Sequence, residues 1–141
     1  MCALGAGACV TRTTTPKQAT PAARGSPNRV EALVRQAITA DAAGDRAADT
    51  LYTPDAVVVA NARARLRTPR FAGIGAGGHV AVAAASVMMQ GHFAWATIDY
   101  RWVNSTQNQA EVGRATFICE EKREGWRIIH AHSSQLLPWD R

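Results

Sequence analysis

The chain has 141 residues, of which 47% are hydrophobic and 19% are charged, so it can fold as one domain with a core. Its formal net charge is +5, and Arg12, Lys17 and Arg24 place +3 of that charge in residues 1–27, which contain no acid. The remainder is too evenly charged for a dedicated nucleic-acid surface. No apolar run is long enough for a transmembrane helix. We therefore expect neither a nucleic-acid partner nor a membrane partner.

Residues 1–27 are rich in Thr, Pro, Ala and Gly and have almost no large apolar side chain. Such a segment cannot bury enough surface to order itself, so we expect a disordered tail followed by a single domain over residues 28–141. The opening MCALGAGAC is faintly similar to the end of a lipoprotein signal, but it is short and lacks a basic leader. We expect a cytoplasmic protein, with export or lipid anchoring as the alternative if the true N-terminus is longer.

Helical periodicity marks the first part of the domain. Asn28 and Glu31 have the spacing of a capping box, and apolar residues then recur at helical spacing up to Gly44. A second short helix is expected over residues 45–52, ended by Pro54. The glycine cluster GIGAGG before residue 79 lacks the context of a dinucleotide fingerprint. It is expected to turn the chain into a third helix, His79 to Gln90, with Met88 on its buried side.

Strand patterns make up the rest. The β-branched run Ala56–Ala60 predicts a buried strand, and Phe71 begins a second, short one. Arg63, Arg65, Arg67 and Arg70 are expected in the loop between them. Longer strands are predicted over residues 92–104, 109–122 and 126–137, the last two joined by a turn at Glu124 and Gly125. Cys119, in the second of these, is expected to be a reduced core thiol. Helices segregated from an antiparallel sheet define an α+β fold.

Particular segments resemble a known superfamily. The helix VEALVRQAITADAAGD leads into LYTPDAVVV, and the strand pair GRATFICEE and REGWRIIHAHSS follows. This order is similar to the nuclear transport factor 2-like, or SnoaL-like, superfamily over about residues 28–137. The terminal strand also resembles the association domain of calmodulin-dependent kinase. The resemblance implies a cone-shaped, curved sheet around a long first helix, with a central pocket, and a homodimer formed through the outer face of the sheet.

The terminal segment GWRIIHAHSS contains two histidines two residues apart. Because alternate residues of a strand share a face, Trp126, Ile128, His130, His132 and Ser134 are expected to point the same way. In one interpretation His130 or His132 is a general acid or base in the cavity. In the other, both are hydrogen-bonded wall or interface residues. No metal site is expected, because two histidines alone supply half a site and no Cys or Asp is spaced to complete it.

Asp99 is the best candidate for a catalytic acid or base. Apolar and aromatic neighbours would raise the pKa of its carboxyl group, and Arg101 could orient it. If that face meets water instead, Asp99 and Arg101 form an ordinary surface pair. The predicted catalytic residues are Asp99, His132, His130 and Arg101. The predicted pocket-lining residues are Tyr52, Asn61, Trp95, Trp102, Arg114 and Met88.

The catalytic residues of enzymes in this superfamily match this sequence to different degrees. The Asp base of ketosteroid isomerases is replaced by Ala60 or Asn61, and limonene-epoxide hydrolases would need a second carboxylate on the last strand. SnoaL-like cyclases, which use an Asp and a histidine, fit best. We therefore expect a small-molecule pocket protein, with a cofactor-free isomerase, cyclase or epoxide hydrolase acting on a small apolar substrate as one hypothesis. The alternative is a non-catalytic ligand-binding or oligomerisation domain.

Overall fold

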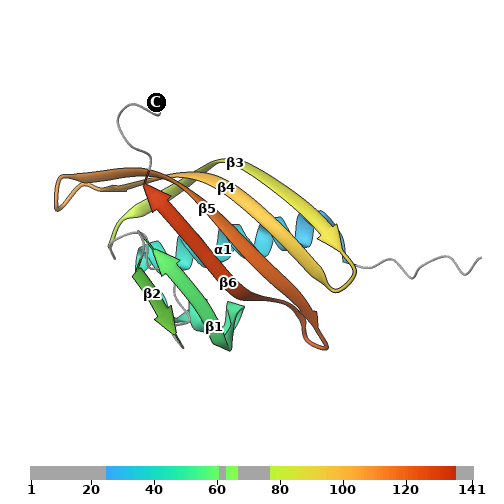
Figure 1. Cartoon of the computed structure of the whole chain (residues 1–141). Coiled ribbons are helices and arrows are strands. Elements are labelled where there is room, and N and C mark those ends of the chain that lie inside the picture. Colours follow the sequence, from blue (N-terminus) through green and yellow to red (C-terminus); the bar gives the residue numbers. More distant parts are fainter. Residues whose placement is uncertain (1–24, 61–62, 67–76, 136–141) are drawn as a thin grey trace, which may run out of the picture.

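The computed structural model describes residues 25–60, 63–66 and 77–135 (Figure 1). The expected tail up to residue 24, the strand from Phe71 and the glycine cluster up to residue 76 lie outside these residues. The elements are α1 (Pro27–Ala43), the 3₁₀ helix η1 (Arg46–Leu51), β1 (Tyr52–Ala60), β2 (Arg63–Leu66), β3 (His79–Gln90), β4 (Phe93–Asn104), β5 (Gln109–Lys122) and β6 (Gly125–Gln135).

Helix α1 begins two residues earlier than the capping box suggested. Ser26 is the N-cap, and its hydroxyl oxygen accepts a hydrogen bond from the Asn28 N–H at 3.3 Å. Pro27 occupies the first helical position, where its fixed φ suits the helix and its missing N–H costs nothing. Gly44 ends the helix with a φ of 73°, as expected at this glycine. The predicted apolar stripe is confirmed, with these residues buried: Val30, Leu33, Val34, Ala37 and Ile38.

The segment after α1 is more extended than predicted. The second helix is a single 3₁₀ stretch, and Asp45 caps it by accepting a hydrogen bond from the Ala47 N–H at 2.9 Å. Strand β1 then starts at Tyr52 and includes Pro54. Its pairing with β6 is irregular between Tyr52 and Val57, which removes the need for a backbone donor at the proline.

The expected third helix is wrong, because residues 79–90 form strand β3. The alternation of its half-buried side chains has a period of two, and one break falls at Ala83, beside a register shift against β4. An alanine-rich segment satisfies both helical and strand periodicity, so pairing with β4 decides its conformation. Gly91, with a φ of 62°, makes the tight turn between these two strands. Met88, expected on a buried side, is 68% exposed.

The sheet has the strand order β2-β1-β6-β5-β4-β3. Strands β1 and β6 are parallel, and every other neighbouring pair is antiparallel. The second half of the expected arginine loop is undescribed, but Arg63–Leu66 is strand β2 rather than loop. Helix α1 crosses one face of the curved sheet (Figure 1), which confirms the α+β class. None of the helices in the described part of the chain has the length and apolar character that a membrane span requires.

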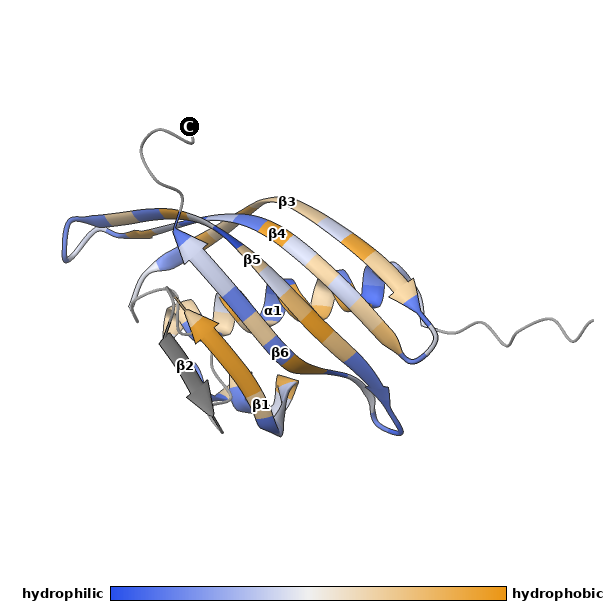
Figure 2. Ribbon diagram, in the orientation of Figure 1, coloured by the Kyte–Doolittle hydropathy of each residue, from blue (hydrophilic) through white to orange (hydrophobic). Residues whose placement is uncertain are grey.

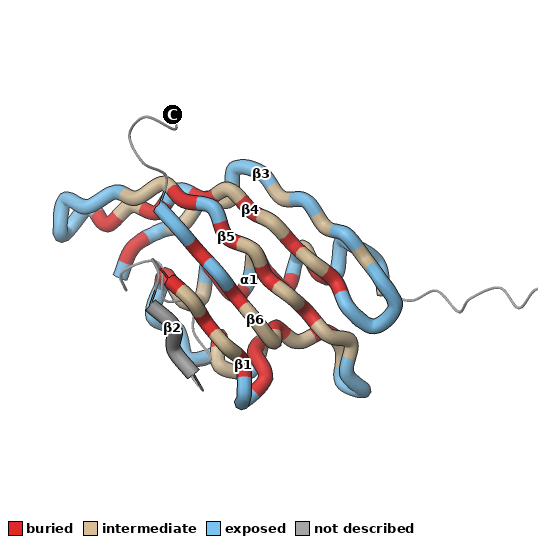
Figure 3. Tube along the Cα trace, viewed as in Figure 1, coloured by how far each residue is buried: buried red, intermediate tan, exposed pale blue. Residues whose placement is uncertain are grey.

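The two faces of the sheet differ in burial, and Figure 3 shows the alternation along β4 and β5. The inner face packs against α1 in one apolar cluster, which includes Ala96, Ile98, Phe117 and Ile128. The outer face carries no helix from the described residues. Figure 2 shows that apolar colour continues along β1 and β3, while β6 is mixed. The core therefore fixes which side chains of each strand can take part in an interior site.

Candidate functional site

A β-bulge decides where the two histidines point. In the pairing of β6 with β5, Ile128 lies opposite Cys119 and His130 lies opposite Ile118. Ile129 is therefore an extra residue with no partner residue on β5. The alternation of the strand therefore changes phase at this point. Trp126 and Ile128 are buried on the inner face before the bulge.

After the bulge the inner-face residues are Ala131 and Ser133, both buried. His130 and His132 consequently lie on the outer face, where His130 is half-buried and His132 is exposed. The expectation that all five alternate residues share one face is wrong, because the strand is not regular. Burial and the proximity of His132 lower the pKa of His130 below its usual value of 6.5.

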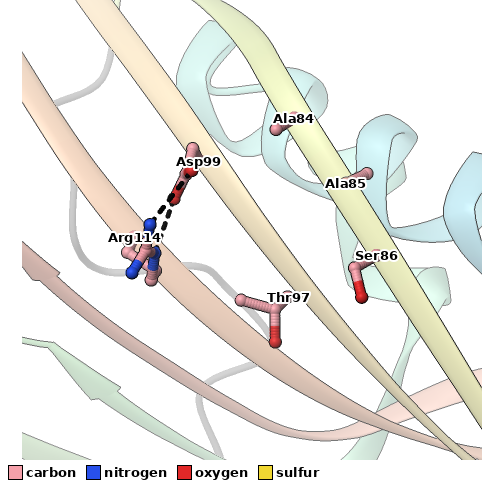
Figure 4. Close-up of a pocket in the computed structure, with 6 residues that line it drawn as sticks. All are labelled: Ala84, Ala85, Ser86, Thr97, Asp99 and Arg114. Atoms are coloured by element: carbon pink, nitrogen blue, oxygen red, sulfur yellow. Dashed lines mark hydrogen bonds and ion pairs between the residues drawn. The ribbon is translucent and has the colours of Figure 1, made fainter.

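Asp99 also lies on the outer face, and its partner is Arg114 rather than Arg101 (Figure 4). Asp99 and Arg114 are opposite each other in the register of β4 and β5. The guanidinium donates two hydrogen bonds, from Nε to Oδ1 at 2.6 Å and from Nη2 to Oδ2 at 3.2 Å. Arg101 is exposed and pairs in register with Val112.

This ion pair reverses the electrostatic expectation for Asp99. The hydrogen bond from Arg114 holds the pKa of its carboxyl group below the usual 3.8, although partial burial opposes the shift. A raised pKa was expected from aromatic and apolar neighbours, and that expectation is wrong. Asp99 therefore stays ionised near neutral pH and acts as the partner of an arginine.

The outer face does not bring Asp99 and the histidines together. Across the sheet, Asp99 is aligned with Arg114 and then with Ser134. His132 is aligned with Thr116, two residues further along each strand. Strand spacing of about 4.8 Å and a rise of about 3.3 Å per residue separate the Cα atoms of Asp99 and His132 by about 12 Å. Arg114 lies between them. A direct hydrogen bond within one subunit is excluded by this spacing.

A shallow depression of about 390 Å³ surrounds the Asp99–Arg114 pair. Figure 4 shows the small side chains that leave room for it on β3, beside Thr97 of β4. Its lining residues are Ala84, Ala85, Ser86, Thr97, Asp99 and Arg114.

Two more predicted pocket residues belong to the outer face. The register aligns Met88 with Trp95, Trp95 with Ile118, Ile118 with His130, and His130 with Val57. We call this set the outer row: Met88, Trp95, Ile118, His130 and Val57. It crosses the strands from β3 to β1, and Phe93, 41% exposed, extends the apolar surface next to it. Trp95 and Met88 therefore do not face the interior.

The interior offers a polar cluster that the sequence did not single out. Tyr100 is 1% exposed on the inner face of β4, and its hydroxyl donates a hydrogen bond to Glu111 Oε1 at 3.2 Å. Ser133 of β6 lies close enough to this phenol to affect its ionisation. Burial, followed by the charge of Glu111, raises the pKa of Tyr100 far above its usual value of 10.0. The phenol is therefore a permanent hydrogen-bond donor.

Gly113 makes this cluster possible. A Cβ atom at Gly113 would overlap the Tyr100 hydroxyl and ring. The glycine is thus needed for close approach rather than for an unusual φ. In the sequence, the only sign of this arrangement is the apolar alternation of residues 94–100, which places Tyr100 among buried residues.

A depression of about 420 Å³ lies next to the cluster. Trp102, one of the predicted pocket residues, lines it and is 3% exposed. The other lining residues are Asn108, Gln109, Ala110, Glu111 and Gln135. Glu111 therefore belongs both to the part-buried hydrogen bond with Tyr100 and to the wall of an open depression.

The remaining predicted residue that can be placed, Tyr52, is elsewhere. It is 3% exposed, and its hydroxyl donates a hydrogen bond to Asp41 Oδ2 at 2.8 Å. It lines a separate depression of about 380 Å³ with residues of the β5–β6 turn. Asn61 lies outside the described residues. Within the described ranges, no three His, Cys, Asp or Glu side chains are grouped in a way that could hold a metal ion.

Comparison with solved structures gives the class of the fold. A nuclear transport factor 2-like protein from Salmonella enterica has a TM-score of 0.66 and 16% identity, over 79% of this chain and 91% of that one. A candidate ketosteroid isomerase from Parabacteroides distasonis has a TM-score of 0.61 and 15% identity, covering 82% and 92%. A candidate calcium/calmodulin-dependent protein kinase II association domain from Xanthomonas campestris has a TM-score of 0.62 and 22% identity, covering 88% and 96%. The fold is therefore nuclear transport factor 2-like.

The sequence itself identifies the family. The family model described as a SnoaL-like domain matches residues 30–138. The chain belongs to the SnoaL-like domain family, within the nuclear transport factor 2-like superfamily. No curated protein matches its sequence.

Proposed function

We propose that this chain binds a small, largely apolar molecule at the Tyr100–Glu111 cluster, reached through the depression that Trp102 lines. The supporting observation is the Tyr100–Glu111 hydrogen bond at 3.2 Å, in which Tyr100 is buried and Glu111 is half-buried. A carboxylate and a phenol cost free energy when they are removed from water, so their presence beside a core needs a reason. Trp102 and Ala110 give the depression an apolar part, and its other lining residues supply hydrogen-bonding groups that could orient a ligand.

The charge state of the cluster sets the chemistry of the ligand. Tyr100 uses its proton for Glu111, so a carboxylate oxygen of Glu111 is the group that remains to accept from a ligand. A hydroxyl or an enolisable carbonyl on an apolar skeleton fits this demand. Proton abstraction by Glu111 would extend binding to isomerase, cyclase or dehydratase chemistry, and similar folds have been described as a candidate ketosteroid isomerase and a candidate dehydratase.

Catalysis by Asp99 with His130 or His132 stays a prediction. Its geometry is unfavourable, because the pair Asp99–Arg114 is already closed and the histidines lie in other rows of the outer face. Glu111 is a better candidate for the proton acceptor than Asp99, because it alone of the two lies on the inner face.

The test is a screen of small ketones, epoxides and polyketide-like hydroxyketones by NMR chemical-shift perturbation. We expect shifts centred on Tyr100 and Trp102, and at least a tenfold weaker affinity in Glu111→Gln. Glu120→Gln is the matched control, because Glu120 lies on the same strand but pairs with Lys122 at 2.6 Å on the outer face. Equal affinity loss in both variants, or shifts confined to the outer face, would contradict the proposal.

A second function, self-association through the outer face, is favoured by the outer row and by Phe93. Exposed apolar side chains rimmed by polar ones mark surfaces on which proteins associate. The Asp99–Arg114 pair is neutral as a unit, so two copies of this face can meet without like-charge repulsion. A kinase association-domain candidate among the similar folds adds to this argument.

Sedimentation velocity at pH 8 tests the second proposal. We expect a homodimer in the wild type and a monomer in Met88→Glu, which places a charge on a side chain that is 68% exposed. Thr106→Glu, in the exposed β4–β5 turn, is the control and should remain dimeric. A wild-type monomer at high concentration would refute self-association and leave the interior site untouched.

A further inference from the structure

The bulge at Ile129 places two titratable side chains side by side on the face proposed for self-association. His130 has Ile118 and Val57 as its register neighbours. His132 has Thr116 and Val59. All four neighbours are uncharged, so neither strand beside β6 supplies a carboxylate directly opposite a histidine.

The charged groups around the histidines are already engaged. Along β5, Arg114 pairs with Asp99, and Glu120 pairs with Lys122. Arg127 precedes the bulge on β6 and donates a hydrogen bond to the Trp126 carbonyl oxygen at 3.0 Å.

On β1, the one carboxylate near this region is Asp55, two residues before Val57. The Thr53 side chain and its own backbone N–H are its main hydrogen-bond partners, and Lys122 is the cation that acts on it. Among the described residues, therefore, each carboxylate of this region has a partner other than the histidines.

We propose that proton uptake by His130 and His132 dissociates a homodimer formed through the outer face. This inference rests on the proposed self-association. A dimer would bring four imidazoles, two from each copy, between apolar surfaces with no carboxylate reserved for them. Imidazolium in such an environment costs desolvation and like-charge repulsion, whereas neutral imidazole costs much less to bury and has no charge to repel.

The direction of the pH dependence follows from proton linkage. Burial already lowers the pKa of His130 below 6.5 in one subunit, and a covering partner lowers it further. Dissociation therefore takes up protons. The dimer is fully stable above about pH 7, and its dissociation constant rises as the pH falls through the lowered pKa of His130 in the free subunit.

The experiment is sedimentation velocity from pH 8 to pH 5.5 on the full chain. From pH 7 to pH 5.5 we expect the dissociation constant to rise at least about 10-fold, because an average uptake of only about 0.7 proton per dimer gives that factor and up to four protons can be taken up. The double variant His130→Gln, His132→Gln should keep its pH 8 dissociation constant throughout. The variant His130→Lys carries a charge at every pH and should be monomeric even at pH 8.

The matched control is His92→Gln, which removes a histidine in the β3–β4 turn whose side chain is 72% exposed. It should dissociate as the wild type does. Near-UV circular dichroism at pH 5.5 establishes that the subunits stay folded. A wild-type dimer that ignores pH, or a double variant that dissociates as the wild type does, overturns the inference alone. A wild-type monomer at pH 8 overturns self-association and the inference with it.

Discussion

Gly113→Ala tests the origin of the interior cluster. A Cβ atom at this position would overlap the Tyr100 hydroxyl and lie 2.8 Å from the Ser134 carbonyl oxygen, so both a side chain and backbone must move. Overpacking of this kind costs about 1–3 kcal/mol. Displacing the phenol also weakens a hydrogen bond to a carboxylate, which adds about 1.5–3 kcal/mol, while the loss of glycine's freedom in the unfolded chain returns about 0.4–1 kcal/mol.

The expected net loss is therefore about 1.5–5.5 kcal/mol in the free energy of unfolding, measured by urea titration at pH 7. A double-mutant cycle with Tyr100→Leu separates the two contacts. If the phenol is the obstacle, Gly113→Ala should cost at least about 1 kcal/mol less in the Tyr100→Leu background than in the wild type. A cost below about 0.5 kcal/mol for the single variant, or full additivity in the cycle, would refute the close approach that we infer.

Three further outcomes are expected. Phe117→Ala should lower the free energy of unfolding by about 3–5 kcal/mol in urea, since Phe117 is 0% exposed, whereas Phe93→Ala should cost under about 1 kcal/mol. Burial raises the pKa of the Cys119 thiol to about 12. In a Cys2→Ser, Cys9→Ser background, Cys119 should therefore not react with a thiol-selective disulfide reagent at pH 8 until urea unfolds the chain. Rapid labelling of the folded protein would contradict its burial. Because Arg114 lowers the pKa of Asp99, that pair stabilises the fold above pH 3.8 and loses its effect as the pH falls through the lowered value. The urea midpoints of the wild type and Asp99→Asn should thus differ at pH 7 and converge toward pH 2.5, and parallel curves would argue against the pair.

The sequence predicted the parts of the fold in which local pattern and tertiary structure agree. The stripe from Val30 to Ile38 and the long strands around Trp95, Phe117 and Ile128 are confirmed because their apolar residues repeat at the period of the element they form. The helix predicted over residues 79–90 was wrong because alanine fits both the helical and the strand period. Only pairing with β4 distinguishes the two conformations. Composition within that segment could not supply this information.

The site was harder to predict than the fold. One unpaired residue, Ile129, places His130 and His132 on the face opposite Trp126 and Ile128, and nothing in GWRIIHAHSS marks a bulge. The choice of Asp99 failed for a related reason, because its partner Arg114 is distant in sequence and adjacent only across the sheet. Tyr100 and Glu111 were overlooked because their contact depends on Gly113, whose role is visible only when β4 and β5 are aligned.

The parallel pairing of β1 with β6 has a consequence for synthesis of the chain. Residues 57–60 hydrogen-bond with residues 130–133, so some seventy residues must emerge before β1 gains its second neighbour. Closing so long a loop is entropically costly and slows folding. Until then, β1 is paired only with β2, and its other edge, which β6 occupies in the complete sheet, has no neighbour. A chaperone that shields extended apolar segments would therefore act on this protein late in translation, just before GWRIIHAHSS leaves the ribosome.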